Sequence, residues 1–177
     1  PQQKAYDEII ETFKEQNIPL LHGVTSSGKT EIYTHLIDNA LKCGLQALYL
    51  VPEIALTTQL TQRLHKNFGD RLLIYHSKFS DNERVDIWKK LLHSNEPCVV
   101  IGVRSSVFLP FGKLGIVIVD EEHETSYKQQ DPAPRYNARD AALILASMHG
   151  AKTLLGSATP SIQTYFKAES GKYGLVK

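Results

Sequence analysis

Segments whose apolar residues recur every three to four positions alternate along the chain with short runs that are almost entirely apolar. The first pattern is typical of amphipathic helices, and the second is typical of strands buried on both faces of a sheet. Helices are predicted at residues 2–13, 32–41, 54–68, 81–92, 138–148 and 161–168, and strands at residues 19–21, 47–51, 72–75, 98–101, 114–119 and 152–155. Strands that alternate with helices in this way indicate a mostly parallel sheet with helices on both faces.

Details of the pattern refine the predicted elements. Gly44 and Gly69 follow two helical segments, at the position where glycine commonly ends a helix. The residues predicted to face inward from the 81–92 helix are Ile87, Trp88, Leu91 and Leu92. We predict one α/β domain over residues 1–177, because this length with 42% hydrophobic residues can bury one core and is too short for two. The 161–168 helix is expected to be the last element.

Composition limits the cellular setting more than the function. The formal charge of +1 neither indicates nor excludes a nucleic-acid partner, because a basic surface can be local. Cys43 and Cys98 form no Cys/His cluster, which argues against zinc and a disulfide framework. With no membrane-length apolar run and no signal peptide, we expect a cytoplasmic protein without a membrane partner. Because the chain begins at Pro1 rather than Met, we expect it to be excised from a longer protein.

A glycine-rich segment between the first predicted strand and the next helix fits the pattern G-x-x-x-x-G-K-[ST]. Its residues are Gly23, Val24, Thr25, Ser26, Ser27, Gly28, Lys29 and Thr30. In a strand, loop and helix of this kind, backbone N–H groups and the helix N-terminus surround a phosphate chain. We expect Lys29 to face solvent and reach the β- and γ-phosphates, and Thr30 to hold Mg²⁺. The alternative, a glycine-rich surface turn, is disfavoured by the flanking elements.

Carboxylates follow the apolar run at 114–119. In parallel sheets ligands bind outside the carboxyl ends of the strands, so Asp120 and Glu121 are expected at the same edge as the glycine-rich loop. Asp120 is predicted to hold Mg²⁺, and Glu121 to orient and deprotonate an attacking water. The alternative is an acidic turn that caps the following helix.

Three motifs together resemble those of a known family. The loop at 23–30, Asp-Glu-Glu-His at 120–123 and Ser-Ala-Thr at 157–159 resemble motifs I, II and III of superfamily 2 helicases. With the segments at 51–57 and 126–130, the chain more narrowly resembles the primosomal protein N′ (PriA) family of bacterial replication-restart DNA helicases, from Gln2 to about Tyr165. The resemblance implies a RecA-like P-loop NTPase domain, the first of two helicase lobes, which binds ATP and Mg²⁺ in an ATP-dependent 3′-to-5′ DNA helicase.

The resemblance also implies roles for individual residues. Gln2, or alternatively Gln3, corresponds to the glutamine that reads adenine. The residues expected to contact single-stranded DNA or to couple its binding to the ATP site are Pro52, Glu53, Arg104, Ser105, His123, Tyr127, Lys128, Arg135, Tyr136, Ser157 and Thr159. Among these, Tyr127 or Tyr136 would stack on bases, with Lys128 and Arg135 near phosphates. The alternative for 126–136 is a polar surface loop.

Two positions depart from the family pattern. Ser26 stands where many members have glycine, and Asn137 replaces an expected histidine, which leaves the role of that side chain in doubt. The sequence contains no second helicase lobe with its arginine finger, no zinc module and no N-terminal DNA-binding domain. We therefore expect the isolated lobe to hydrolyse ATP barely, if at all.

Competing functions are separated by their own motifs. A GTPase would carry an Asn/Thr-Lys-x-Asp segment, which is absent, and a nucleotide kinase would not need the Ser-Ala-Thr segment. Another superfamily 2 DNA or RNA translocase remains open, as does a nucleotide-binding interaction module without turnover. For the longer protein, the resemblance implies forked and single-stranded DNA, other primosome proteins and single-stranded DNA-binding protein as partners. The oligomeric state stays open.

Overall fold

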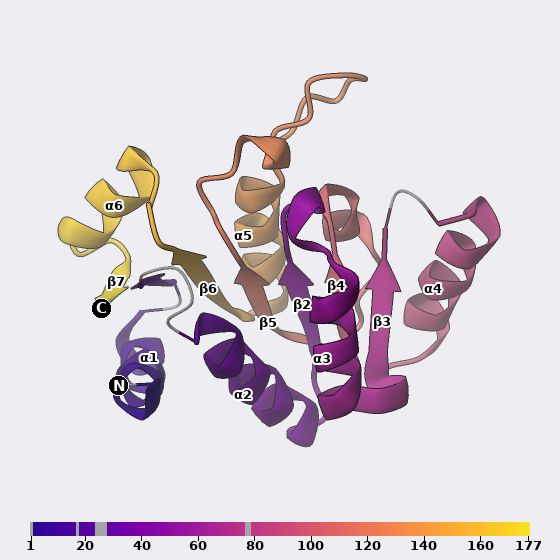
Figure 1. Ribbon diagram of the computed structural model, residues 1–177, viewed down its shortest axis with the longest axis horizontal. Coiled ribbons are helices and arrows are strands. Elements are labelled where there is room, and N and C mark those ends of the chain that lie inside the picture. Colours follow the sequence, from indigo (N-terminus) through magenta and orange to yellow (C-terminus); the bar gives the residue numbers. More distant parts are fainter. Residues whose placement is uncertain (1, 17, 24–27, 77–78) are drawn as a thin grey trace.

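The computed structural model describes residues 2–16, 18–23, 28–76 and 79–177. Within these residues, one sheet of seven parallel strands lies between two layers of helices (Figure 1). The strands are β1 (Pro19–His22), β2 (Gln46–Leu50), β3 (Leu72–Tyr75), β4 (Val99–Gly102), β5 (Leu114–Val119), β6 (Lys152–Ser157) and β7 (Gly174–Val176). The α-helices are α1 (Gln2–Glu15), α2 (Lys29–Lys42), α3 (Thr58–Phe68), α4 (Asp81–His93), α5 (Ala138–His149) and α6 (Ile162–Glu169). The predicted α/β class is confirmed.

Alternate residues of the strands supply two separate cores. On one face, Tyr49 packs with the inner sides of α1, α2 and α3. On the other, Leu48 and Leu50 pack with α5, α6 and Leu91 of α4. Because both faces are covered, β2 is buried along its whole length and residues 47–50 form a continuous apolar run rather than an alternating one, which is the pattern that the sequence showed.

The strand order is β3-β4-β2-β5-β6-β1-β7, and every pairing is parallel. Strand β1 therefore lies between the last two strands of the chain, with Leu20 opposite both Leu155 and Leu175. Since all strands run in one direction, their carboxyl ends meet at a single edge. The segments that follow β1, β2, β4, β5 and β6 are thus gathered there from distant parts of the sequence.

Side-chain caps fix where several helices begin. Ser80 and Glu83 form a capping box at α4, and Thr57 accepts a hydrogen bond from the Leu60 amide at α3. Asn137, whose role the sequence left in doubt, caps α5 by accepting from the amides of Arg139 and Asp140. A neutral short side chain at this position is well suited to that task.

Three predictions about the elements were wrong. The helix expected at 54–68 begins only at Thr58, because Glu53–Ala55 forms a separate 3-10 turn and Thr57 caps the new start. Trp88 and Leu92 are 43% and 49% exposed, because α4 covers the outermost strand β3 and buries only Leu91 fully. The short strand β7 was missed, since three residues are too few for a periodic signal. Among the described residues, no helix is both long and apolar enough to cross a bilayer.

Candidate active site

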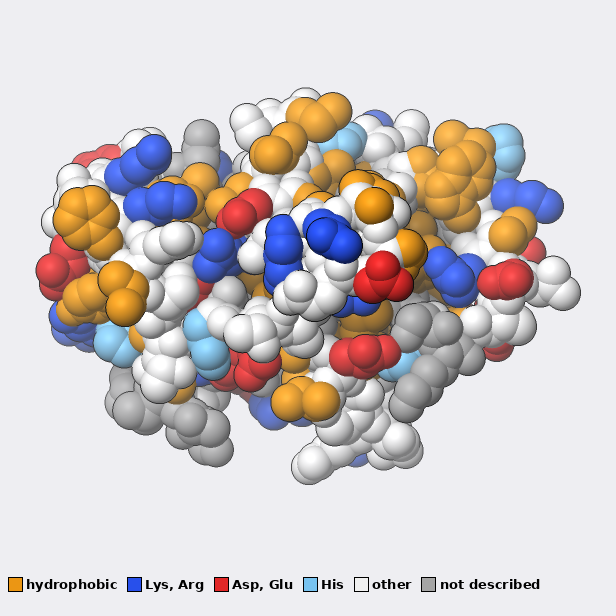
Figure 2. Space-filling model, turned by 90° about the horizontal axis from the view of Figure 1, so that it is seen from above, with side chains coloured by type: hydrophobic (Ala, Val, Ile, Leu, Met, Phe, Trp, Pro, Cys, Tyr) orange, Lys and Arg blue, Asp and Glu red, His pale blue; other side chains and the backbone are white. Residues whose placement is uncertain are grey.

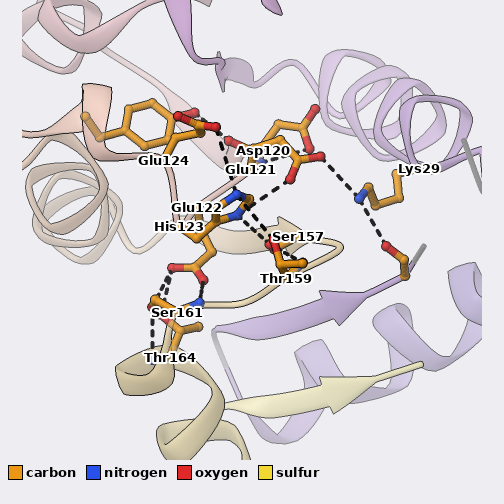
Figure 3. Close-up of polar contacts among 12 residues, drawn as sticks. Lys29, Asp120, Glu121, Glu122, His123, Glu124, Ser157, Thr159, Ser161 and Thr164 are labelled. Atoms are coloured by element: carbon orange, nitrogen blue, oxygen red, sulfur yellow. Dashed lines mark hydrogen bonds and ion pairs between the residues drawn. The ribbon is translucent and has the colours of Figure 1, made fainter. Parts of the chain in front are cut away.

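The carboxyl edge of the sheet brings three of the predicted motifs together (Figure 3). Lys29 begins α2, the segment 120–123 follows β5, and Thr159 follows β6. Of the predicted phosphate loop, Gly23 and Gly28 to Thr30 are described, whereas Val24, Thr25, Ser26 and Ser27 lie outside the described residues. Gly28 has φ 84°, a left-handed conformation that glycine adopts without steric cost. A glycine in this conformation at the start of a helix is typical of loops that bind a phosphate group.

Lys29 is held at the mouth of this loop. Its Nζ donates to the Gly23 carbonyl at 3.2 Å and to Glu121 Oε1 at 3.4 Å. The side chain is 8% exposed, so the expectation that it faces solvent was wrong. An ammonium group between a loop carbonyl and a carboxylate can exchange these oxygens for phosphate oxygens with little movement, which fits an anionic ligand.

Asp120 is a partly buried carboxylate that accepts several hydrogen bonds. Its Oδ1 accepts from the Tyr33 hydroxyl at 3.0 Å and from the Glu121 amide at 3.1 Å, and its Oδ2 accepts from the Tyr49 hydroxyl at 3.3 Å. Burial and, second, the nearby Glu121 charge raise the pKa of Asp120, although the Tyr33 hydrogen bond opposes this. Bound Mg²⁺ would offset both causes, so Asp120 fits the metal role expected for it.

Thr30, the other predicted Mg²⁺ ligand, is linked to Asp120 through one hydroxyl. Tyr49 is hydrogen-bonded to Thr30 and also reaches Asp120. The Tyr49 hydroxyl therefore contacts both predicted ligands, and an Mg²⁺ ion held by them would take its remaining ligands from phosphate and water. The sequence did not single out Tyr33 or Tyr49, because only the fold brings a helix residue and a strand residue to the same carboxylate.

Gly156 makes room for this cluster. A Cβ atom added at Gly156 would lie 1.8 Å from the Tyr33 hydroxyl oxygen and 3.4 Å from Asp120 Oδ1. Tyr33 is fully buried, so moving its ring would displace neighbours in the core. Glycine at the end of β6 is thus required for the contact between Tyr33 and Asp120.

We expect Asp120→Asn to stabilise the metal-free protein at neutral pH. Because the folded-state pKa of Asp120 is raised, the stability from this group is fully present below the unfolded pKa of about 3.9 and is lost as pH rises through the folded-state pKa. The neutral amide avoids that loss. Thermal unfolding in a chelator should show a higher midpoint than wild type at neutral pH, with the difference shrinking in acid. Asp131→Asn, at an exposed site, is the control, and a lower neutral-pH midpoint for Asp120→Asn would contradict the assignment.

Glu121 has an unusual backbone conformation for its residue type. Its φ of 46° lies in the left-handed region, which costs energy for a residue with a Cβ and is most often seen at functional sites. Its carboxylate lies between Lys29 and His123, with Oε1 3.4 Å from Lys29 Nζ and Oε2 3.7 Å from His123 Nδ1. Glu121 is therefore held beside the expected phosphate position, where a general base would have to be.

His123 connects motif II to the segment after β6. Its Nδ1 lies 2.7 Å from Ser157 Oγ, and its Nε2 lies 3.4 Å from Thr159 Oγ1. Ser157 Oγ also accepts from the Thr159 amide at 3.0 Å. The structure thus brings together three residues that the sequence placed at one edge. The imidazole of His123 already lies next to Glu121, so a shift of either segment would change its position relative to that carboxylate.

A groove of about 250 Å³ opens at the same edge, beside this cluster. It is lined by Val51, Pro52, Glu53, Arg84, Val103, Arg104, Ser105, Ser126, Tyr127 and Gln129. The Arg104 guanidinium donates from Nη1 to the carbonyls of Ser126 at 3.3 Å and Lys128 at 3.4 Å. The segments predicted to contact a nucleic-acid backbone are therefore joined to the predicted coupling loop.

The segment 126–136, which we call the coupling loop because it is predicted to couple DNA binding to the ATP site, forms a hairpin that projects from the edge of the sheet (Figure 1). Lys128 and Asn137 form an antiparallel bridge, and Lys128 Nζ donates to the Arg135 carbonyl. Tyr136 packs edge-on against Phe108, with ring centroids 4.7 Å apart. Phe108 is 59% exposed and was not singled out from the sequence. Figure 2 looks down on this edge and shows Lys and Arg side chains gathered near its centre.

The stacking role expected for Tyr127 was wrong. The side chain is 1% exposed and belongs to the core around α5, so neither face of the ring is open to a base. Its hydroxyl lies within hydrogen-bond distance of the carbonyls of Asp120, at 2.5 Å, and Leu50, at 3.2 Å. Tyr127 instead joins the start of the loop to the backbone of Asp120, the predicted Mg²⁺ ligand, and its coupling role stays a prediction.

A pocket of about 350 Å³ lies next to the phosphate loop, between α1 and α2. It is lined by Gln2, Gln3, Tyr6, Glu31, Ile32, His35 and Asn39. The Gln2 amide packs against Gly28, since a Cβ there would lie 1.8 Å from Gln2 Nε2, whereas Gln3 donates along the helix to Asp7 at 2.9 Å. The geometry favours Gln2 over Gln3 as the residue that faces a nucleotide bound at the loop.

The α/β fold and the motifs at its carboxyl edge indicate a helicase domain, and comparisons with known proteins agree. Residues 1–167 match the DEAD/DEAH box helicase family, to which the chain belongs. Within that family, the chain resembles the replication restart protein PriA of Bacillus subtilis, with 45% identity over 177 residues, and that of Haemophilus influenzae, with 47% identity over 157 residues. These matches cover 99% and 89% of this chain but only 22% and 21% of the relatives. The chain therefore spans about a fifth of their length.

Solved structures share the fold at low sequence identity. A DEAD box protein from the hyperthermophile Methanococcus jannaschii has a TM-score of 0.70 and 18% identity, covering 99% of this chain and 48% of its own. The structure of RecG bound to a three-way DNA junction has a TM-score of 0.68 and 23% identity, covering 98% of this chain and 22% of its own. These likenesses support the RecA-like α/β architecture.

Proposed function

We propose that this chain is the ATP-binding first lobe of a longer, ATP-dependent DNA helicase that acts 3′ to 5′ in replication restart. One observation carries the proposal: the Lys29–Glu121 pair and the groove at Arg104 open at one sheet edge, joined through Tyr127. Similarity to PriA supports the choice of DNA and of stalled forks. Polarity, primosome proteins and single-stranded DNA-binding protein as partners follow from that similarity and concern the longer protein.

On the nucleotide side, each residue has a defined task. Bound Mg·ATP supplies the phosphoryl group, and the metal neutralises part of its charge. Lys29 Nζ holds phosphate oxygens in place of the Gly23 carbonyl, and Asp120 and Thr30 hold the metal. The Glu121 carboxylate orients a water and takes its proton, while His123 keeps that carboxylate in position. A single lobe lacks a transition-state arginine from a second lobe, so appreciable turnover is proposed only for the longer protein.

On the nucleic-acid side, the groove holds the backbone and the hairpin holds bases. Arg104, Ser105 and the Pro52–Glu53 turn suit phosphate contacts, which carry no sequence information and allow movement along any strand. Tyr136 offers an aromatic surface beside Phe108, worth about 1–3 kcal/mol per stacked base. Lys128 and Arg135 on the hairpin add positive charge near the strand.

We expect the full-length protein to hydrolyse ATP faster with forked DNA than with linear DNA, and faster with either than without DNA. Because the hairpin joins the groove to the ATP site, the double variant Lys128→Ala/Tyr136→Ala should lose this stimulation, measured as ATPase rate against DNA concentration. Lys172→Ala, which removes an exposed charge outside this edge, is the matched control.

Other outcomes identify the competing functions. Equal stimulation by forked and linear DNA would indicate a general DNA translocase, and preferential stimulation by RNA would indicate an RNA translocase. Nucleotide binding without turnover under all conditions would indicate an interaction module and overturn the proposal.

A further inference from the structure

Glu122 is a buried carboxylate between Glu121 and His123. The roles predicted for those two neighbours do not explain why Glu122 is there. The side chain is 2% exposed. Its Oε1 accepts from the Ser161 amide at 2.7 Å, and its Oε2 accepts from Thr164 Oγ1 at 2.8 Å and Ser161 Oγ at 3.1 Å (Figure 3). Oε2 also accepts from Arg139 Nη1 at 3.0 Å. Both carboxylate oxygens are therefore fully satisfied inside the protein.

Three elements meet at this carboxylate. Glu122 lies in the turn after β5, Arg139 in the first turn of α5, and Ser161 caps α6. Arg139 Nη1 also donates to Ser161 Oγ at 3.2 Å, so each member of the cluster contacts the other two. The Glu122 amide donates to the Gly156 carbonyl at 3.0 Å, which ties the same turn to the end of β6.

A buried ion pair of this kind fixes geometry more than it adds stability. Taking two charges out of water is costly, and apolar residues of similar volume often stabilise a core as well or better. What the ion pair provides is a single arrangement in which both carboxylate oxygens of Glu122 accept hydrogen bonds. Glu122 is flanked by Glu121, with its left-handed φ of 46°, and by His123, which lies against Ser157. A rotation of the turn would move both neighbours.

Arg139 also connects this turn to the hairpin. Asn137, two residues earlier, caps α5 and forms the bridge with Lys128 that closes the hairpin. A displacement of the hairpin base therefore acts on the first turn of α5, from which Arg139 extends to Glu122.

We propose that Glu122 and Arg139 are a positioning pair, which holds the turn carrying Glu121 and His123 against α5 and α6 and sets how that turn responds to nucleic acid bound at the hairpin. The second half of this proposal rests on the proposed function. Neither residue touches the reacting atoms, and both act through Glu121 and His123. Their loss should therefore change the response to nucleic acid more than the binding of nucleotide.

The test compares four variants of the full-length protein with wild type. Glu122→Gln and Arg139→Gln each remove one charge of the pair, and the double variant removes both. Asp140→Asn is the matched control, because Asp140 also pairs with Arg139, from Nε to Oδ1 at 3.0 Å, but its side chain is 56% exposed and does not contact Glu122. Two measurements are made: backbone hydrogen exchange of residues 120–125 and 157–164 without ligand, and kcat and KM for ATP with and without single-stranded DNA.

Each single variant should speed exchange in those two segments while the rest of the sheet keeps its protection. DNA-stimulated kcat should fall at least about fivefold, with KM for ATP within about threefold of wild type. The double variant should lose no more than the worse single variant, as expected for two residues acting as one unit. Asp140→Asn should match wild type in both measurements.

Two results would overturn the proposal that Glu122 and Arg139 position the turn. Exchange that rises throughout the chain, with basal and stimulated rates falling in the same proportion, would mean a purely structural contact. Unchanged exchange and unchanged stimulation would mean that the turn is held by other contacts. If wild-type protein itself fails to hydrolyse ATP, the proposed function is wrong, and hydrogen exchange alone then decides whether the pair positions the turn.

Discussion

Lys29→Ala is expected to lower ATP turnover by the full-length protein by a factor on the order of a hundred to a thousand. Lys29 Nζ lies against the Gly23 carbonyl at the start of α2, so its removal takes a positive charge away from the expected phosphate position. Nucleotide binding should weaken together with turnover, because the contact is made both before and during the reaction. Steady-state ATPase and equilibrium binding of ATP measure the two effects.

The matched control for this variant is Lys42→Ala. Lys42 lies in the last turn of the same helix and also pairs with a carboxylate, Asp38, at 2.6 Å, but its side chain is 68% exposed. Its replacement should leave ATPase unchanged and affect stability by less than about 1 kcal/mol. Thermal unfolding of both variants checks that each is folded. Full turnover by folded Lys29→Ala protein would end the assignment of the phosphate site.

Glu121→Gln is expected to permit Mg·ATP binding while lowering hydrolysis by a factor of about 10² to 10⁴. The amide keeps the shape of the side chain and an oxygen that can accept from Lys29, but it cannot take a proton from water. Because the predicted Mg²⁺ ligands Asp120 and Thr30 are both retained, metal binding should persist. Binding is measured by calorimetry and hydrolysis by single-turnover phosphate release.

Glu124→Gln serves as the control for the loss of a nearby negative charge. Glu124 Oε1 lies 3.9 Å from His123 Nε2, and its side chain is about as exposed as that of Glu121. This variant should hydrolyse ATP within a few-fold of wild type. Loss of Mg·ATP binding in Glu121→Gln would instead show that Asp120 and Glu121 have exchanged roles.

The sequence predicted where the chemistry lies, because parallel strands place their carboxyl ends at one edge and the unusual residues follow those strands. Lys29, Asp120 and Glu121 could be found in this way. The supporting contacts could not, since Tyr33, Tyr49 and Arg139 meet the motif II residues only after the chain has folded. No local period encodes such distant pairs.

Exposure was predicted least well where local pattern and tertiary context disagree. Tyr127 lies in a polar, proline-containing segment that predicts a surface loop, yet its ring is in the core. Trp88 and Leu92 continue an apolar helical stripe, yet α4 covers only an outer strand and leaves both exposed. In each case burial is decided by what the neighbouring elements can cover.

The position of β1 between β6 and β7 also has a consequence for synthesis on the ribosome. Leu20 is synthesised more than a hundred residues before its partners Leu155 and Leu175. At typical translation rates this delay is on the order of ten seconds. During that interval β1 lacks both of its hydrogen-bonded neighbours, and Lys29 has no Glu121 to contact. The amino-terminal part of the site is therefore made well before the sheet edge that completes it, and β1 stays an unpaired strand edge until β6 and β7 have been synthesised.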